Sequence, residues 1–329
     1  MQREMTIATL KLPEVSVIIV SYNTREMTLA CLNSVFEQSS MTNIEVIVVD
    51  NGSSDGSANA ILKSFGNVNL IKSAENLGFA KANNRAIRKA HGKYILLLNP
   101  DTVILDNAIE RLLKFAKENP DAGIWGGRTV FADGRLNPAS SWGFMTVSSL
   151  FFQAVGLSAI FRFTNFFNPE AYGGWKRDSV RRVDIVTGCF LLITKKLWDS
   201  LNGLDETFFM YAEEADLCYR AKALGARPLA TPYATIIHYG GASEAARSGK
   251  VIKLLTGKAT FIRKHWNVVS SKFGIFLLKT ATLVRLLGFS TIGFFTRDEK
   301  YIKVAREWRD IWNARKAWSA GYDLSEFKE

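Results

Sequence analysis

The chain alternates short apolar runs with longer segments in which apolar residues recur every three or four positions. Continuous β-branched runs at residues 15–20 (VSVIIV) and 44–49 (IEVIVV) are typical of parallel strands covered on both faces. Further strands are predicted at residues 68–72, 94–98, near 122–125, 183–194 and 235–238. Helices are predicted at about residues 26–38, 75–90, 106–118 and 196–201, and in a segment ending at Gly225. This alternation predicts an α/β fold with a doubly wound, mostly parallel sheet.

The pattern changes after Arg128. Residues 143–168 contain seven phenylalanines and are interrupted too often for a transmembrane helix. One interpretation of this Phe-rich insertion is a lid or insertion that packs on the core of the domain. The alternative is a surface that faces an acceptor or a lipid.

The C-terminal region is basic and mainly helical in pattern. Residues 246–329 hold 17 Lys and Arg but 7 Asp and Glu, whereas residues 1–245 hold 25 and 24. The apolar stretch 273–295 has about the length of a membrane span. Lys279 and Arg285 interrupt it on roughly one side of a helix, which favours a helix lying in the membrane plane.

The end of this region interleaves aromatic and basic residues between residues 298 and 318, which is typical of an interface anchor. The alternative is a solvated helical hairpin packed on the main domain. The excess of positive charge predicts an anionic partner, such as a membrane surface or a lipid phosphate. Nucleic acid is not expected, because no nucleic-acid-binding module is recognisable.

These differences divide the chain into two regions. We expect one domain over residues 14–245, including the Phe-rich insertion, and a helical C-terminal region over residues 246–329. The three cysteines, Cys31, Cys189 and Cys218, lack metal-site spacing and are expected to be buried thiols in a reducing cytosol. The N-terminal residues contain no apolar core of a signal peptide.

Acidic residues and one histidine lie after apolar strands or in polar loops. They are Asp50, Asp101, Glu213, Glu214, Asp216 and His238. A carboxylate at the end of a buried strand is unfavourable unless it binds a partner. Ligands of open α/β sheets bind at the carboxyl ends of the strands. Together these residues indicate a metal-dependent enzyme that acts on a nucleotide-linked substrate.

Six segments resemble glycosyltransferase family 2 and occur in that family's order. They are VSVIIVSYN, VIVVDNGSSDGS, ENLGFAKANN, YILLLNPDT, GLDETFFMYAEEADLCYRAKALG and IIHYGGAS, within residues 14–245. The resemblance implies an inverting enzyme with the GT-A fold, a Rossmann-like, mostly parallel sheet with helices on both faces. It is nearest to the rhamnosyltransferase-like branch, which builds bacterial cell-wall and surface polysaccharides and typically has NPD where other members have DxD.

The resemblance implies how a nucleotide-sugar donor is bound. Asp50 matches the aspartate that contacts the base, and Asp101 matches the metal-binding aspartate. The structural alternative for Asp50 is a helix N-cap, and for Asp101 it is a turn aspartate after Pro100. Asn99 replaces the first carboxylate of DxD, so it can bond the ribose but carries no charge. The residues expected at the donor are Ser21, Tyr22, Asn23, Asp50, Asn76, Lys81, Asn99, Asp101 and Arg128. Lys81 and Arg128 are equally compatible with plain surface charges.

The diphosphate leaving group needs a hard divalent cation, Mg²⁺ or Mn²⁺, with open positions for phosphate oxygens. The resemblance implies that Asp101 and His238 hold it. A lone histidine is more often structural, so the role of His238 depends on the family.

Inversion needs a base that takes the proton of the acceptor hydroxyl. Family members use the second acidic residue of an ED pair at a helix start, which here is Glu214. The pair reads Glu213-Glu214, and the extra methylene moves the carboxylate, so Glu213 is the second choice. Asp216 is expected to support the helix or an acceptor hydroxyl. The structural alternative is that all three acids favour a helix N-terminus.

The resemblance therefore implies a non-processive glycosyltransferase that moves L-rhamnose from dTDP-L-rhamnose to a lipid-linked or polysaccharide acceptor. A UDP-sugar donor, galactofuranose or N-acetylglucosamine, is the alternative, and a catalytically silent scaffold on the same fold is another. A processive synthase is not expected, because the QxxRW motif and multiple membrane helices are missing. The expected location is the cytoplasmic face of the cell membrane, as a peripheral protein and possible homo-oligomer.

Overall fold

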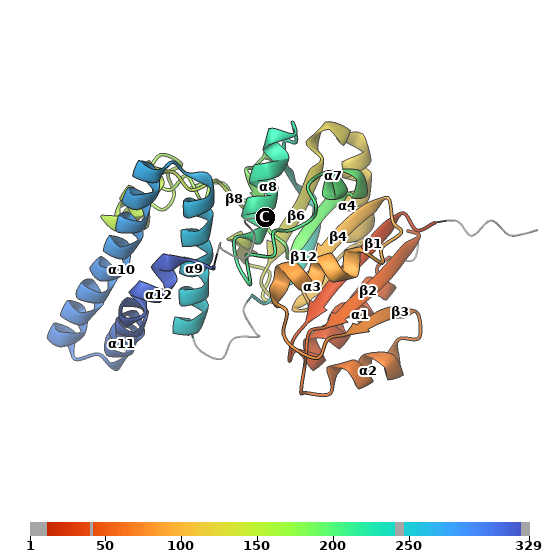
Figure 1. Ribbon diagram of the computed structural model, residues 1–329, viewed down its shortest axis with the longest axis horizontal. Coiled ribbons are helices and arrows are strands. Elements are labelled where there is room, and N and C mark those ends of the chain that lie inside the picture. Colours follow the sequence, from red (N-terminus) through yellow and green to blue (C-terminus); the bar gives the residue numbers. More distant parts are fainter. Residues whose placement is uncertain (1–11, 40–41, 241–246, 324–329) are drawn as a thin grey trace, which may run out of the picture.

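A computed structural model of the chain describes residues 12–39, 42–240 and 247–323 (Figure 1). The N-terminal residues, for which no signal peptide is expected, lie largely outside these ranges. The domain boundary expected between residues 245 and 246 also lies outside them. The strands are β1 (Val15–Ser21), β2 (Ile44–Asp50), β3 (Val68–Lys72), β4 (Tyr94–Leu98), β5 (Thr102–Ile104), β6 (Ile124–Val130), β7 (Leu136–Asn137), β8 (Ser141–Trp142), β9 (Arg181–Arg182), β10 (Ile185–Val186), β11 (Phe190–Thr194) and β12 (Leu229–His238). The helices are α1 (Arg25–Glu37), α2 (Ser57–Ser64), α3 (Gly78–Ile87), α4 (Ala108–Glu118), α5 (Val147–Ala154), α6 (Leu157–Ile160), α7 (Lys195–Ser200), α8 (Glu213–Ala223), α9 (Arg247–His265), α10 (Val268–Thr296), α11 (Glu299–Asn313) and α12 (Arg315–Ala320).

The central sheet has the order β3-β2-β1-β4-β11-β6-β12-β5. The first four strands are parallel, and β6 and β12 are also parallel to each other. β11 lies antiparallel between β4 and β6, and β5 is antiparallel to β12 at the edge. The predicted α/β fold with a mostly parallel sheet is confirmed.

Alternate residues of each central strand enter two separate cores. Ile18 of β1 packs on the face that α3 and α8 cover, whereas Val17 and Ile19 pack on the face that α1 and α4 cover. This is the period of two expected when both faces of a strand are buried. The three cysteines are free and buried, as expected.

The strand predicted at residues 183–194 is wrong as a single element. It is divided into β10 and β11 by a turn at residues 187–189, and β10 pairs with β8 outside the main sheet. The first predicted turns of the helix at residues 75–90 are also wrong, because α3 begins only at Gly78. A φ of +76° at Gly78 reverses the chain there, a conformation that favours glycine.

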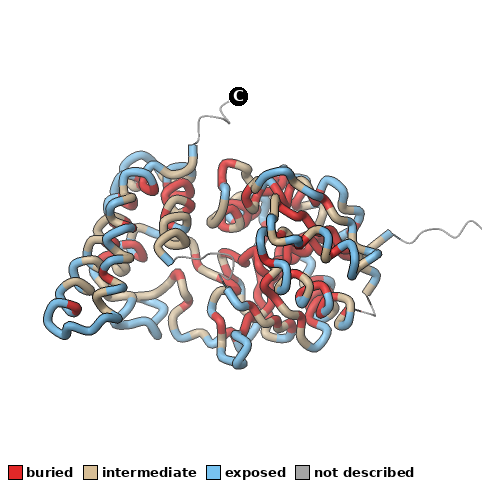
Figure 2. The backbone as a smooth tube through the Cα atoms, turned by 90° about the horizontal axis from the view of Figure 1, so that it is seen from below, coloured by how far each residue is buried: buried red, intermediate tan, exposed pale blue. Residues whose placement is uncertain are grey.

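Helices α9–α12 form a separate unit beside α8 (Figure 1). A third core joins them, built from Leu150 and Ala154 of α5, Ala259 and Ile262 of α9, Leu278 of α10 and Trp318 of α12, among others. The interpretation of the Phe-rich insertion as packed on the core of the main domain is therefore wrong for α5, whose buried face lies against the C-terminal helices. Figure 2 shows buried backbone concentrated in the sheet region and only in short segments of the helical unit.

Helix α10 is long and apolar enough to cross a membrane, by length and composition alone. Only 28% of its most apolar window is buried. Its buried side, which includes Gly274, Ile275 and Ala281, packs within the helical unit. Phe276, Leu287 and many other large apolar residues of α10 remain exposed.

Candidate active site

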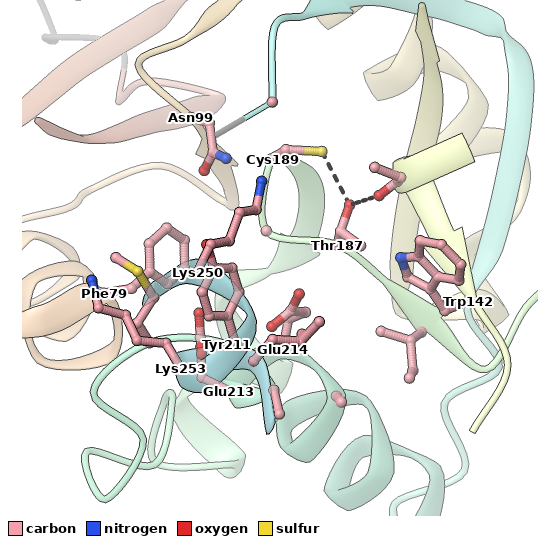
Figure 3. Close-up of a pocket in the computed structure, with 18 of the residues that line it drawn as sticks. Phe79, Asn99, Trp142, Thr187, Cys189, Tyr211, Glu213, Glu214, Lys250 and Lys253 are labelled. Atoms are coloured by element: carbon pink, nitrogen blue, oxygen red, sulfur yellow. Dashed lines mark hydrogen bonds between the residues drawn. The ribbon is translucent and has the colours of Figure 1, made fainter. Parts of the chain in front are cut away.

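A cavity of about 750 Å³ lies at the carboxyl ends of the parallel strands (Figure 3). Residues that follow β1, β2 and β4, namely Tyr22, Asn51 and Asn99, line one part of it. The turn before α8, helix α9 and the Phe-rich insertion line the rest. The sheet and the C-terminal helices therefore build this cavity together.

Asp101 and His238 meet within the cavity. The register of β12 on β5 places His238 opposite Thr102, and its Nε2 lies 3.4 Å from Oδ1 of Asp101. The other carboxylate oxygen of Asp101 accepts a hydrogen bond of 3.0 Å from the N–H of Gly240. Asn99 Nδ2 lies 3.4 Å from the same imidazole nitrogen. The predicted Asn99, Asp101 and His238 are thus brought together.

The two groups influence each other's ionisation. Burial favours the neutral acid, but the hydrogen bond and charge of His238 lower the pKa of Asp101 overall. Burial also favours the neutral form of His238, which lowers its pKa. Interactions with Cys189 and Asp101 outweigh burial and raise the pKa of His238 to about 10. A cation bound here would replace the imidazole proton, because a ligating histidine is neutral.

The donor set fits a divalent cation that the substrate completes. Asp101 Oδ1 and His238 Nε2 lie 3.4 Å apart and both residues line the cavity, and Mg²⁺ is commonly held by one or two protein ligands plus substrate phosphates. Across residues 12–39, 42–240 and 247–323, no group of three or more His, Cys, Asp or Glu side chains is placed to hold a metal. A cation would therefore depend on phosphate oxygens for most of its ligands.

Asn76 is held in position by Asn51, which the sequence analysis did not single out. Asn51 Nδ2 donates to Asn76 Oδ1 at 2.9 Å, and Asn51 Oδ1 accepts from the N–H of Leu77 at 2.9 Å. Both asparagines line the cavity. The position of Asn51, immediately after β2, is the signal that would have identified it.

Several predicted donor residues do not line the cavity. Asp50 is 5% exposed and accepts a hydrogen bond from the N–H of Ser53, as a turn residue does. The hydroxyl of Ser21 lies 2.9 Å from that of Thr28. Asn23 accepts a hydrogen bond from the N–H of Ser54, at the loop that follows Asp50. These residues brace the two loops beside the cavity.

The two predicted basic donor contacts lie apart from the cavity lining as well. Lys81 is exposed on α3. Arg128 lies in β6, and its buried Nε has no hydrogen-bond partner within the described part of the chain. Tyr22 does line the cavity, with a side chain that is 39% exposed.

Glu213 and Glu214 lie at the start of α8 and line the cavity. Each has a buried Oε2 atom without a hydrogen-bond partner among the residues that the structure describes. Burial raises the pKa of both carboxyl groups, and the charge of Glu214 further raises that of Glu213, well above its usual range. Two unpartnered buried oxygens in one cavity are costly unless a ligand completes them.

The backbone before these glutamates is strained. Tyr211 and Ala212 have φ values of 69° and 72°, in the left-handed region that non-glycine residues rarely adopt. Such conformations cluster at functional sites, where the surrounding structure holds them in place. Figure 3 shows Tyr211, Glu213 and Glu214 on the same side of the cavity.

Asp216 lies one turn further along α8 and does not line the cavity. It is fully buried, and its carboxylate lies 2.6 Å from Arg220 Nε, 2.7 Å from Lys264 Nζ and 2.8 Å from His265 Nε2. Burial favours its neutral form, but these partners outweigh burial and lower the pKa of Asp216 to about 2. This carboxylate connects α8 to the end of α9.

The C-terminal region and the insertion contribute residues that the sequence analysis did not assign to the site. Lys250, Lys253 and Lys258 of α9 line the cavity, as do Gln153 of the insertion and Trp142 of β8. Lys258 forms an ion pair of 3.1 Å with Glu170. The spacing of the three lysines along α9 places them on one face of the helix, and this spacing is the signal that the sequence offers for them.

Comparison with known proteins identifies the family. The model of glycosyl transferase family 2 matches residues 16–189. The chain belongs to glycosyl transferase family 2. This membership confirms the predicted family and the assignment of the protein as a glycosyltransferase. The match includes β1 to β4 and Asp101, but it ends before the two glutamates and His238.

Two curated relatives each match more than half of this chain. An N-acetylglucosaminyl-diphospho-decaprenol L-rhamnosyltransferase of Mycobacterium tuberculosis is 26% identical over 214 residues, 60% of this chain and 66% of the relative. The uncharacterized protein y4gI of Sinorhizobium fredii is 26% identical over 242 residues, 70% of this chain. The match with y4gI spans 25% of that protein. The chain therefore covers less than two thirds of the length of each of these two relatives.

A solved structure resembles almost the whole fold. The mannosyltransferase PcManGT from Pyrobaculum calidifontis, in complex with GDP-Man and Mn²⁺, has a TM-score of 0.60, covering 94% of this chain and 88% of that one. The identity is 14%, so this likeness supports the GT-A fold alone. The predicted GT-A fold is confirmed.

Proposed function

We propose that this glycosyltransferase is an inverting, non-processive rhamnosyltransferase that uses dTDP-L-rhamnose and a divalent cation. Its acceptor would be a sugar linked to a polyprenyl diphosphate. The observation that carries the proposed chemistry is the pair Glu213-Glu214. Both residues line the same cavity as Asp101 and His238, and each has a buried oxygen without a hydrogen-bond partner among the described residues. The proposed sugar and acceptor are those in the name of the mycobacterial relative, and the dTDP carrier is what the family resemblance implies.

Two adjacent buried carboxylates favour a division of roles. Glu213, whose pKa is raised more strongly, holds a proton, so that Glu214 carries the charge of the pair. Glu214 then takes the proton of the acceptor hydroxyl while the hydroxyl oxygen attacks the anomeric carbon of the donor sugar. The bond from that carbon to the nucleotide diphosphate breaks on the opposite side, which inverts the configuration. A base with a raised pKa is closer to the ideal for proton transfer near neutral pH.

Asp101 and His238 would hold the cation, with Asn99 beside them. When bound, a divalent cation stabilises the charge that develops on the leaving diphosphate. Asn51 and Asn76 would position the donor from the adjoining wall. Asp50, Ser21 and Asn23 would act by bracing the loops, since they do not line the cavity.

The location proposed is the cytoplasmic face of the membrane. Exposed large apolar residues are frequent in the Phe-rich insertion and in α10. They are Phe151, Val155, Ile160, Phe161, Phe163, Phe166, Phe273, Phe276, Leu287, Ile292, Phe294 and Phe295. The region from residue 246 also carries a formal excess of 10 positive charges. Apolar side chains combined with positive charge favour an anionic lipid surface.

The test is a donor panel. Purified full-length protein is incubated with dTDP- and UDP-sugars, with Mn²⁺, Mg²⁺ or EDTA, and a diphosphate-linked acceptor, and nucleotide diphosphate release is measured. We expect release from dTDP-L-rhamnose that EDTA abolishes. Release from UDP-galactofuranose or UDP-N-acetylglucosamine instead would contradict the proposed donor, and equal release in EDTA would contradict the cation. Flotation with anionic but not neutral vesicles is expected for the proposed location.

A further inference from the structure

Helix α9 presents a row of cations to the candidate active site. Lys250, Lys253, Leu254 and Lys258 all line the cavity that Glu213 and Glu214 line. Positions separated by three, four and eight residues share one face of a helix. Figure 3 shows Lys250 and Lys253 extending from α9, the former in the direction of Asn99 and the latter in the direction of Phe79.

The distance between α9 and the glutamates is fixed by backbone contact. A Cβ placed on Gly257 would lie 2.3 Å from the carbonyl oxygen of Tyr211 and 3.3 Å from Ala212 Cβ. Only glycine at this position lets α9 lie against the strained turn that precedes Glu213. Lys264 and His265, one end of the same helix, are bonded to Asp216 of α8. The lysines are therefore held on a rigid support beside the carboxylates.

The three lysines lie in different surroundings. Lys258 is paired with Glu170, which also accepts a hydrogen bond of 2.6 Å from Ser149. Lys250 and Lys253 are half-buried on the cavity side of α9. Half-buried ammonium groups in a cavity attract anions more strongly than ammonium groups on an open surface, because the wall excludes water.

A phosphate group is an anion that suits these lysines. The surroundings of the lysines favour the diphosphate of the acceptor over that of the donor. The donor diphosphate has Asp101 and His238 for its cation. The α9 lysines and Gln153 of α5 line the same cavity, and α5 also carries the exposed apolar Phe151. An acceptor sugar on a polyprenyl diphosphate presents a hydroxyl, a diphosphate and an apolar chain in that order. The carboxylates, the lysines and α5 offer matching surfaces.

We propose that Lys250 and Lys253 form a subsite for the diphosphate of the acceptor, an inference that rests on the proposed function. The C-terminal region then takes part in substrate recognition as well as in membrane binding. Because the acceptor carries both its hydroxyl and its diphosphate on one sugar, holding the diphosphate would orient the hydroxyl toward Glu214.

The test compares two lipid-linked acceptors, of which only the first carries a diphosphate next to the sugar: N-acetylglucosaminyl-diphospho-farnesol and octyl N-acetylglucosaminide. Full-length wild type, Lys250→Gln, Lys253→Gln and the double variant are assayed, with Lys63→Gln on the exposed face of α2 as the charge-matched control. We expect the double variant to raise KM for the diphosphate acceptor by about tenfold or more, the size of a lost charge-assisted contact. KM for the donor, KM for the octyl glycoside and all constants of Lys63→Gln should stay unchanged.

Binding of the same two acceptors is measured by calorimetry, so that the inference does not depend on turnover. If wild type binds the diphosphate acceptor more tightly than the octyl glycoside and the double variant loses that preference, the subsite stands even if dTDP-L-rhamnose is not the donor. An unchanged preference in the double variant would overturn it. A rise confined to the donor KM would assign the lysines to the leaving group and overturn the acceptor subsite.

Discussion

The sheet and the helical unit build opposite parts of one cavity by different physical means. Asn51, Asn99 and Asp101 reach it because parallel strands end at one edge of the sheet. Lys250 and Lys253 reach it because a glycine allows α9 to lie against the turn before α8. The first arrangement follows from local chain geometry, and the second depends on a tertiary contact. The family match ends at residue 189, before either the glutamates or α9.

The largest expected effect is at the glutamates, where the two regions meet. Glu214→Gln keeps the shape of the side chain but removes the base, so the turnover number should fall by about two to four orders of magnitude. Donor affinity, measured by calorimetry, should change little. Glu213→Gln should be milder, because glutamine replaces a side chain that is already protonated. A larger loss in Glu213→Gln than in Glu214→Gln would exchange their roles, and full activity in both would contradict the assignment of the base to this pair.

Asp101 tests the sheet side of the comparison. Asp101→Ala removes a carboxylate proposed to hold the cation, and we expect activity to fall by about a hundredfold, the range seen for lost electrostatic stabilisation. The dependence of the residual activity on Mn²⁺ concentration should weaken. Asp50→Ala is the matched comparison, since its carboxylate braces a turn beside the cavity. An equal effect of both variants on Mn²⁺ dependence would contradict the assignment of Asp101.

The sequence predicted the sheet side of the cavity better than the helical side, because the sheet side follows from local chain geometry and the helical side depends on a tertiary contact. Polar residues that follow apolar runs are local signals, so Asp101, His238 and the glutamates were singled out, while their roles came from the family resemblance. Asn51 was missed although it has the same local signal. The break between β10 and β11 falls at Thr187 and Gly188, a short polar and glycine signal inside a mainly apolar segment that was predicted as one strand. The contact of Gly257 with Tyr211 joins residues distant in sequence, so nothing in the pattern indicates that α9 lines the site.

Gly257→Ala tests whether the helical unit is needed for the site. The added methyl group would lie 2.3 Å from the carbonyl oxygen of Tyr211, so α9 must move away from the turn before Glu213. We expect turnover to fall by about tenfold to a hundredfold, as small displacements of catalytic groups do. Gly249→Ala is the matched control in the same helix, because a Cβ there meets nothing within 4 Å. It should retain activity and, since alanine favours helix, not lower the melting temperature. Equal activity of the two variants would contradict the role of the contact.

Asp216 gives the smallest effect, and it concerns stability and pH. Its pKa is about 2 in the fold against an ordinary value of 3.8. A depressed pKa contributes stability that is fully present above the ordinary value and is lost as the pH falls through the folded value, so the loss should occur between about pH 4 and pH 2. The contribution at neutral pH is about 2 kcal/mol.

Asp216→Asn should therefore lower the free energy of unfolding at pH 7 by about 2 kcal/mol or more, because Arg220, Lys264 and His265 lose their shared acceptor. Urea unfolding at a series of pH values measures this directly, and the difference from wild type should narrow as the pH falls toward 2. Asp199→Asn, which breaks the exposed pair with Lys195, should cost at most about 1 kcal/mol. If the two variants were equally stable at pH 7, Asp216 would not connect α8 to α9 energetically. The helical unit would then be positioned mainly by the close contact at Gly257.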